Sequence, residues 1–220
     1  MTFQPHVLML TGTCGSGKST VAGLISRRAD WVRVSEDDIW PRLFGKDRGV
    51  FGTDEHRAKR AAVQNHVLER VRLAQAAGRN IVLDATVHES PPEALNEYGV
   101  RFHAVPIAWR LCVLRPDLAV AIARDAARER NSLGASRVSS LHAKFTGQAM
   151  PKDCFLDTSH DTAEQTAARV LDGGCWLTIG SSDRGSRLQW AKEGVDDWDK
   201  SAPLDGGATP RRSTSSLGGG

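Results

Sequence analysis

Short apolar runs alternate with longer segments of mixed polarity along most of the chain. Each apolar run is bounded by turn residues and followed by a polar segment long enough for a helix, which predicts strands alternating with helices. The predicted strands cover about 7–11, 31–35, 80–84, 107–114 and 155–156. This alternation is typical of an α/β fold, with a five-stranded parallel sheet between two layers of helices.

The segments between these strands carry apolar residues at helical spacing. In the longest, about residues 55–77, Val63, Val67 and Val71 recur every four residues and predict one buried helix face. The other predicted helices cover about 17–28, 116–129, 138–146 and 162–171, with a further helix starting at Pro91 and Pro92. Residues 39–54 contain several glycines and are expected to be irregular.

The composition changes near residue 174, which divides the chain into three predicted parts. Residues 1–173 complete the α/β domain, and residues 174–200 form a partly ordered C-terminal extension that opens with a short strand at about 175–179. Residues 201–220 are rich in Gly, Ser, Pro and Thr and are expected to be disordered. The order expected in the extension rests on three tryptophans, Trp176, Trp190 and Trp198.

Composition and charge exclude several classes of protein. The chain has 220 residues and a formal net charge of +3, which does not by itself indicate a dedicated nucleic-acid binder, although a nucleic acid stays possible as an acceptor. Its four cysteines form no C-x-x-C pair, and no H-E-x-x-H motif occurs, so neither a disulfide framework nor a zinc site is predicted. No apolar run approaches the roughly 20 residues of a membrane helix. We therefore expect a cytoplasmic protein with no membrane partner.

The segment 12–19, Gly-Thr-Cys-Gly-Ser-Gly-Lys-Ser, has the spacing G-x-x-x-x-G-K-[ST] of a phosphate-binding loop. A chance glycine turn is the alternative, but the loop follows a predicted strand and precedes a predicted helix, as the mechanism requires. Lys18 is suited to bridge the β- and γ-phosphates of ATP, and the Ser19 hydroxyl to bind Mg²⁺. The residues predicted to bind the nucleotide are Gly12, Thr13, Cys14, Gly15, Ser16, Gly17, Lys18, Ser19 and Thr20.

The chain lacks the N-K-x-D motif of GTPases and the L-S-G-G-Q motif of transporter ATPases. A small phosphotransferase or a stand-alone ATPase remains. The doublet Asp37-Asp38 favours the former, because a carboxylate at the carboxyl end of a strand can take the proton of a hydroxyl acceptor. A role in capping the next turn is the alternative. Asp84 ends an apolar strand and is predicted either to hold Mg²⁺ through water or to orient the acceptor.

An arginine-rich stretch from Arg124 to Arg137 is predicted to form a lid, because guanidinium groups can clamp a transferring phosphate. The alternative is a solvated helix face. Arg124 is predicted to contact the nucleotide, and Arg128 and Arg130 to contact the phosphoryl group. Arg42 and Asp38 are predicted to bind the acceptor.

Together, the phosphate loop, the Asp37-Asp38 doublet, Asp84, the arginine lid and Asp157-Thr158-Ser159 resemble a P-loop kinase. Residues 7–172 are similar to the 5′-hydroxyl polynucleotide kinases, the chloramphenicol phosphotransferases and the zeta-toxin kinases. The resemblance implies that Asp37 is the general base and that Arg128 or Arg130 touches the transferring phosphate.

The sequence thus predicts an ATP- and Mg²⁺-dependent kinase acting on a hydroxyl of a small molecule. A polynucleotide 5′-hydroxyl kinase is the first alternative, since basic residues follow the doublet; the acidic residues among them weigh against it. A P-loop ATPase or nucleotide switch without an acceptor is the second. The predicted apolar wall of a small-acceptor pocket consists of Trp40, Phe44 and Phe51.

Overall fold

The computed structural model describes residues 6–50, 52–85, 98, 108–129, 132–146, 154–173 and 177–179. Several predicted features lie outside these residues: Arg130, Phe51, the helix start at Pro91 and Pro92, and most of the extension and tail beyond 173.

The centre of the molecule is a parallel sheet whose strands run in the order β2-β3-β1-β4-β5. All four neighbouring pairs are parallel, so the carboxyl ends of the strands meet at one edge of the sheet. The five parallel strands are β1 (His6–Gly12), β2 (Trp31–Ser35), β3 (Asn80–Asp84), β4 (Ala108–Leu114) and β5 (Phe155–Leu156). The predicted sheet is confirmed.

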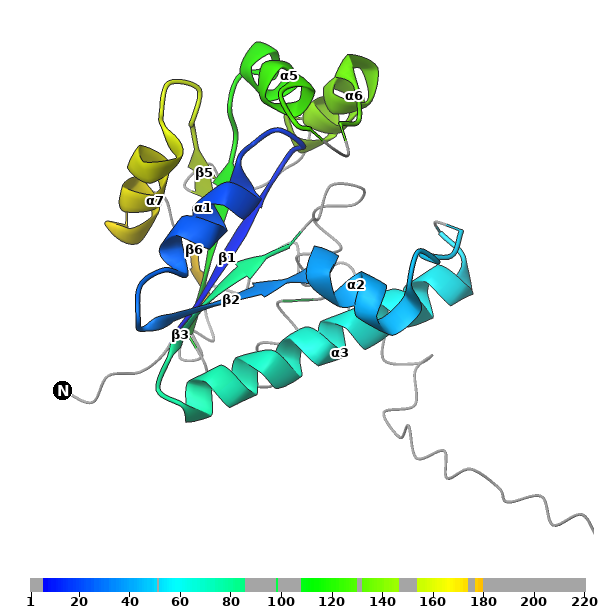
Figure 1. The fold of residues 1–220 in the computed structure, drawn as a ribbon, viewed down its shortest axis with the longest axis vertical. Helices are drawn as coiled ribbons and strands as arrows, with labels where there is room; N and C mark the ends of the chain where they lie inside the picture. The colour runs from blue at the N-terminus through cyan, green and yellow to red at the C-terminus, as the bar shows by residue number, and fades with distance from the viewer. Residues whose placement is uncertain are drawn as a thin grey trace, which may run out of the picture.

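Helices cover both faces of this sheet. Figure 1 shows α1 and α7 together on one face and the long α3 on the other, while α5 and α6 lie beyond the strand ends. The helices are α1 (Lys18–Ile25), α2 (Glu36–Phe44), α3 (Asp54–Ala76), α5 (Leu118–Ala126), α6 (Ala135–Thr146) and α7 (Ala163–Leu171). No helix in the described part of the chain is long and apolar enough to cross a membrane.

Each face of the sheet has its own core. Alternate strand residues such as Val7 and Met9 pack against α3, whose predicted stripe of Val63, Val67 and Val71 is fully buried. The residues between them, such as Leu8, pack against α1 and α7. Strands buried on both faces explain why the apolar runs in the sequence are nearly continuous.

The expectation of irregular structure at residues 39–54 is wrong for its first part, because α2 continues to Phe44. The first turn of α2 carries three carboxylates, and the positive end of the helix dipole stabilises their negative charge. Ile39 and Trp40 are 5% and 7% exposed and belong to the core that α3 covers. This burial stabilises the helix despite Pro41 in its interior.

A sixth strand, β6 (Leu177–Ile179), pairs antiparallel with Trp109–Leu111 of β4. Because β1 occupies the other edge of β4, β6 and β5 share one edge, with β5 pairing further along at Val113 and Leu114. The short strand expected at 175–179 is therefore present at 177–179, and it joins the central sheet.

Candidate active site

The loop between β1 and α1 has the backbone that its glycines predict. Gly15 and Gly17 have φ of 75° and 90°, in the left-handed region. A Cβ on Gly15 would lie 2.1 Å from the carbonyl oxygen of Ala121, and one on Gly12 would lie 2.4 Å from that of Leu114. Only glycine fits at either position, because the loop passes close to the backbones of β4 and α5.

Polar groups of this loop are arranged for an anion. Gly17 caps α1 without a side-chain hydrogen bond, so the first N–H groups of the helix stay available for phosphate oxygens. Lys18 is 7% exposed at the helix start, followed by the exposed Ser19. The hydroxyls of Thr13 and Ser16 are buried and have no hydrogen-bond partner in the described structure, as expected of groups that await a polar ligand.

Cys14 has a structural role within the loop. Its side chain is 8% exposed and packs with Ala121, Val138 and Leu141 of α5 and α6. Burial raises the pKa of the Cys14 thiol more than the charge of the nearby Lys18 lowers it, so the thiol stays neutral. Cys14 therefore anchors the α5–α6 hairpin to the phosphate loop.

The predicted carboxylates lie at the same edge of the sheet as the loop. Asp84 ends β3 in register with Leu10 of β1 and with Ser35 of β2, and it is 4% exposed. Asp37 and Asp38 lie in the first turn of α2, directly after β2, and both side chains are 57% exposed. The parallel topology thus brings all three carboxylates to the edge that holds the phosphate loop.

Arg33 of β2 joins two of these carboxylates and was missed by sequence reasoning. Its Nη2 donates to Oδ2 of Asp84 at 2.8 Å, and its Nη1 donates to Oδ2 of Asp38 at 3.3 Å. A lone arginine between Val32 and Val34, in an otherwise apolar strand, was the signal available in the sequence. The guanidinium thus balances the charge of the buried Asp84 through one carboxylate oxygen, Oδ2.

Glu36, one residue before the doublet, is the carboxylate that α2 turns inward. It is 6% exposed and accepts a hydrogen bond from the Tyr98 hydroxyl. The three consecutive carboxylates look alike in the sequence, and the phase of α2 distinguishes them. Glu36 fixes the helix start, while Asp37 and Asp38 face solvent.

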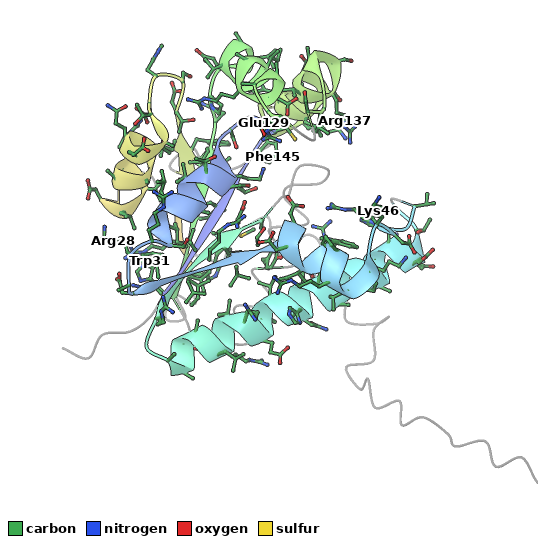
Figure 2. The ribbon with its side chains drawn as sticks, in the orientation of Figure 1. Arg28, Trp31, Lys46, Glu129, Arg137 and Phe145 are labelled. Carbon is green, nitrogen blue, oxygen red and sulfur yellow. The ribbon has the colours of Figure 1, made fainter. Side chains whose placement is uncertain are left out.

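The predicted lid is the hairpin of α5 and α6. Its loop is held by Asp125, which is 1% exposed and accepts hydrogen bonds from Leu133 N, Gly134 N and Ser132 Oγ. Arg128 Nη1 lies 3.6 Å from Oδ1 of the same carboxylate. Arg128 is thus paired within the hairpin, and sequence reasoning missed Asp125. Figure 2 shows Arg137, on α6, at the end of the molecule opposite Arg28 and Trp31.

Arg124 ties the hairpin to the loop after β5. Its Nη2 donates to the carbonyl oxygens of Thr158 and Asp161 at 2.9 and 3.1 Å. In that loop Ser159 donates to Asp157 from both its hydroxyl and its backbone N, which lowers the pKa of the Asp157 carboxyl. The Thr158 hydroxyl is buried without a partner in the described structure. Arg42, predicted to bind the acceptor, is exposed on α2.

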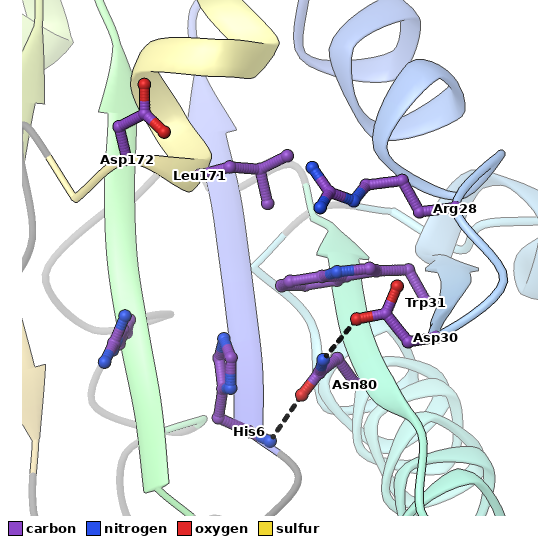
Figure 3. Close-up of a pocket in the computed structure, with 8 residues that line it drawn as sticks. His6, Arg28, Asp30, Trp31, Asn80, Leu171 and Asp172 are labelled. Atoms are coloured by element: carbon purple, nitrogen blue, oxygen red, sulfur yellow. Dashed lines mark hydrogen bonds between the residues drawn. The ribbon is translucent and has the colours of Figure 1, made fainter.

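A cavity of about 260 Å³ lies at the amino ends of the strands, away from the phosphate loop (Figure 3). The Asn80 side chain, which lines the cavity, accepts a hydrogen bond from the backbone N of His6 and donates one to the Asp30 carboxylate. Burial, followed by the charge of Arg110, lowers the pKa of His6, whose ring packs edge-on against Trp31. The cavity is lined by His6, Arg28, Asp30, Trp31, Asn80, Arg110, Leu171 and Asp172. None of these belongs to the predicted site.

The residues at the phosphate loop fit a magnesium ion held together with a nucleotide. Ser19 and Asp84 carry side-chain oxygens, the ligand type that Mg²⁺ prefers. Among the described residues no group of three or more His, Cys, Asp or Glu could hold a metal alone. Mg²⁺ needs no such cage, because phosphates and waters complete its shell.

Comparison with known proteins agrees with this geometry. A family model described as an AAA domain matches residues 7–147, and none of the curated proteins matches the chain in sequence. A tunicamycin resistance protein from Deinococcus radiodurans has a similar structure, with a TM-score of 0.57 and 13% identity over 76% of this chain and 94% of that one. A Janibacter sugar kinase gives a TM-score of 0.54 and 20% identity over 77% and 94%.

The Mycobacterium tuberculosis APS kinase, solved with AMPPNP and APS, gives a TM-score of 0.51 and 20% identity over 78% of this chain and 98% of that one. At these identities the likeness concerns the fold. The family match covers more than half of the chain and includes the phosphate loop, the doublet, Asp84 and α5–α6. The chain therefore belongs to this AAA-domain family and has the fold of a P-loop kinase.

Proposed function

We propose that this protein is an ATP-dependent kinase that transfers the γ-phosphoryl group to a hydroxyl of a small molecule. One observation carries the proposal: a phosphate loop with a buried Lys18 shares an edge of the sheet with a carboxylate, Asp37, that faces solvent. The family match supports the part of the proposal that concerns ATP binding. The solvent-facing carboxylate of Asp37 supports the part that concerns transfer to a hydroxyl acceptor.

The proposed step needs a base and a positive charge. The acceptor hydroxyl gives its proton to the Asp37 carboxylate while its oxygen attacks the γ-phosphorus. The bond from the γ-phosphorus to the β–γ bridging oxygen breaks, and ADP leaves with the electron pair. Lys18 and the N–H groups of the loop stabilise the charge on the phosphates. Ser19 and Asp84 would hold Mg²⁺ together with the nucleotide, and the bound ion would neutralise further charge on the phosphate oxygens.

Ion pairs around the doublet favour a small acceptor over a nucleic-acid strand. Lys59 pairs with Asp47 and Glu55, and Arg57 pairs with Asp54, so acidic groups neutralise cations along this surface. A groove that binds a nucleic-acid strand needs cations that are available to the phosphates of that strand. A labelled oligonucleotide titrated at two salt concentrations tests this, since steep salt dependence with labelling of its 5′ end would make the protein a polynucleotide kinase.

The test of the proposal is a screen of hydroxyl compounds with γ-labelled ATP, using wild type, Lys18→Ala and Asp37→Asn. Lys18→Ala should abolish turnover of ATP. Asp37→Asn should still bind ATP and lose transfer by about 10²–10⁴-fold, the usual effect of a lost general base. Label found only in free phosphate would identify an ATPase. Normal transfer by a folded Lys18→Ala protein would refute the proposal.

A further inference from the structure

Residues 45–50, which follow α2, bring a cation to the proposed base. Arg48 Nη2 lies 3.3 Å from Oδ1 of Asp37, and the two side chains are 56% and 57% exposed. Figure 2 labels Lys46 in the same loop, at the outer end of α2 and far from Arg28. Arg48 is therefore the guanidinium that contacts the proposed base in the described structure.

An aromatic surface guides the Arg48 side chain. Its guanidinium carbon lies 5.5 Å from the centre of the Trp40 ring, and Trp40 is 7% exposed and therefore fixed in the core. His56 stacks on the same indole, with ring centres 5.8 Å apart and an angle of 21° between the planes. The His56 ring also donates from Nδ1 to the Arg48 carbonyl oxygen at 2.8 Å. Trp40 and His56 thus hold Arg48 by its side chain and its backbone.

The rest of the loop is pinned next to Arg48. Asp47 accepts from Gly49 N at 2.9 Å and from Lys59 Nζ at 2.6 Å. The Lys59 bond and then the Gly49 bond lower the pKa of the Asp47 carboxyl. Lys59 also pairs with Glu55, so its single ammonium already serves two carboxylates. In the described structure Arg48 pairs with one carboxylate, although a guanidinium carries five N–H donors.

We propose that Arg48 selects acceptors that carry an anionic group, phosphate or carboxylate, near the reacting hydroxyl. This inference rests on the proposed kinase function. A guanidinium matches both anions with paired hydrogen bonds, and an exposed ion pair such as Arg48–Asp37 is weak enough for a bound anion to replace. The exchange releases Asp37 to accept the hydroxyl proton. It also places the hydroxyl beside the base, because Arg48 and Asp37 are in contact.

The first test needs no acceptor and measures ADP formed from ATP in water by the full chain. An exposed ion pair outweighs its open form by roughly 1.5- to 5-fold, which leaves about 40% to 17% of Asp37 unpaired, so Arg48→Met should raise hydrolysis by about 2.5- to 6-fold. Adding Asp37→Asn should remove the rise. The control is Arg57→Met, since Arg57 is 58% exposed and paired with Asp54 in the same region. Hydrolysis unchanged in Arg48→Met, or raised equally in Arg57→Met, would overturn the inference.

The second test compares matched acceptors, glucose with gluconate and glycerol with glycerol 3-phosphate. For the charged member of any pair that is phosphorylated, Arg48→Met should lower kcat/KM by about tenfold, the effect of losing a charge-assisted hydrogen bond. The uncharged member should lose nothing. Equal losses for both members would show a structural role and refute selection by charge. A loss of kcat/KM with gluconate alone would indicate a carboxylate site, and a loss with glycerol 3-phosphate alone would indicate a phosphate site.

Failure of the proposed function would be visible separately. If Lys18→Ala leaves ATP turnover unchanged, the turnover does not come from this site, and the kinase proposal fails together with the inference. If turnover is lost in Lys18→Ala but Arg48→Met has the same hydrolysis rate and acceptor preference as wild type, the kinase proposal stands and the inference alone is refuted.

Discussion

The ion pair between Arg33 and Asp84 decides how the end of β3 is held, and its removal has a calculable effect. Asp84 is 4% exposed, and Arg33 Nη2 lies 2.8 Å from its carboxylate. Arg33→Met keeps most of the apolar stem and removes the charge, which leaves a buried carboxylate without its cation. Breaking a fully buried pair in this way costs about 3–5 kcal/mol. The Arg33 side chain is 29% exposed, so solvent compensates in part. We expect a loss of about 2–3 kcal/mol in the free energy of unfolding.

The chain offers a matched control in Arg48→Met. The Arg48–Asp37 pair is more than half exposed on both sides, so its loss should cost about 0–1 kcal/mol. A second variant tests the cause. Arg33→Met combined with Asp84→Asn leaves no buried charge unpaired and should regain most of the stability that Arg33→Met loses.

Urea denaturation of the full chain measures these differences, with the free energy extrapolated to water. In thermal denaturation a loss of 2–3 kcal/mol corresponds to a fall of about 4–12 °C in Tm for a domain of this size. The reasoning is refuted if Arg33→Met lies within about 1 kcal/mol of Arg48→Met. It is also refuted if the double variant is less stable than Arg33→Met alone.

Two further predictions concern the lid and the sheet edge. Burial raises the pKa of Asp125, but the hydrogen bonds from Leu133, Ser132 and Gly134 outweigh it and the net pKa is lowered. A carboxyl with a depressed folded pKa stabilises the fold above its unfolded pKa of about 3.9 and loses that contribution as the pH falls through the folded pKa. The Tm advantage of wild type over Asp125→Asn should therefore be constant from about pH 7 to 5 and shrink below about pH 4; an advantage independent of pH would contradict this assignment. A chain ending at residue 173 lacks β6 and its pairing with β4, so it should melt at lower temperature than a chain ending at residue 180; equal Tm values would show that β6 adds no stability.

Local spacing was enough to predict most of the fold. The alternation of apolar runs with amphipathic segments predicted the parallel sheet, and β2 and β3 begin and end where the apolar runs do. The phosphate loop was equally clear, because its glycines and Lys18 act through backbone geometry that a short segment encodes by itself. α2 was missed, because residues 36–44 are stabilised as a helix by the packing of Ile39 and Trp40 against α3, which lies far along the chain.

The site itself depended on contacts between distant segments. That Glu36 is buried while Asp37 is exposed follows from the phase of α2 over the core, and the three carboxylates in a row give no sign of it. Arg33 meets Asp84, 51 residues away, only because β2 pairs with β3 in the observed register. The sequence by itself determined which chemical groups gather at the carboxyl edge of the sheet, since strand ends are local features. Which of those groups are paired, buried or exposed was decided by the tertiary structure, because side-chain pairing across strands depends on register and helix phase, and these are set by the packing of the whole domain.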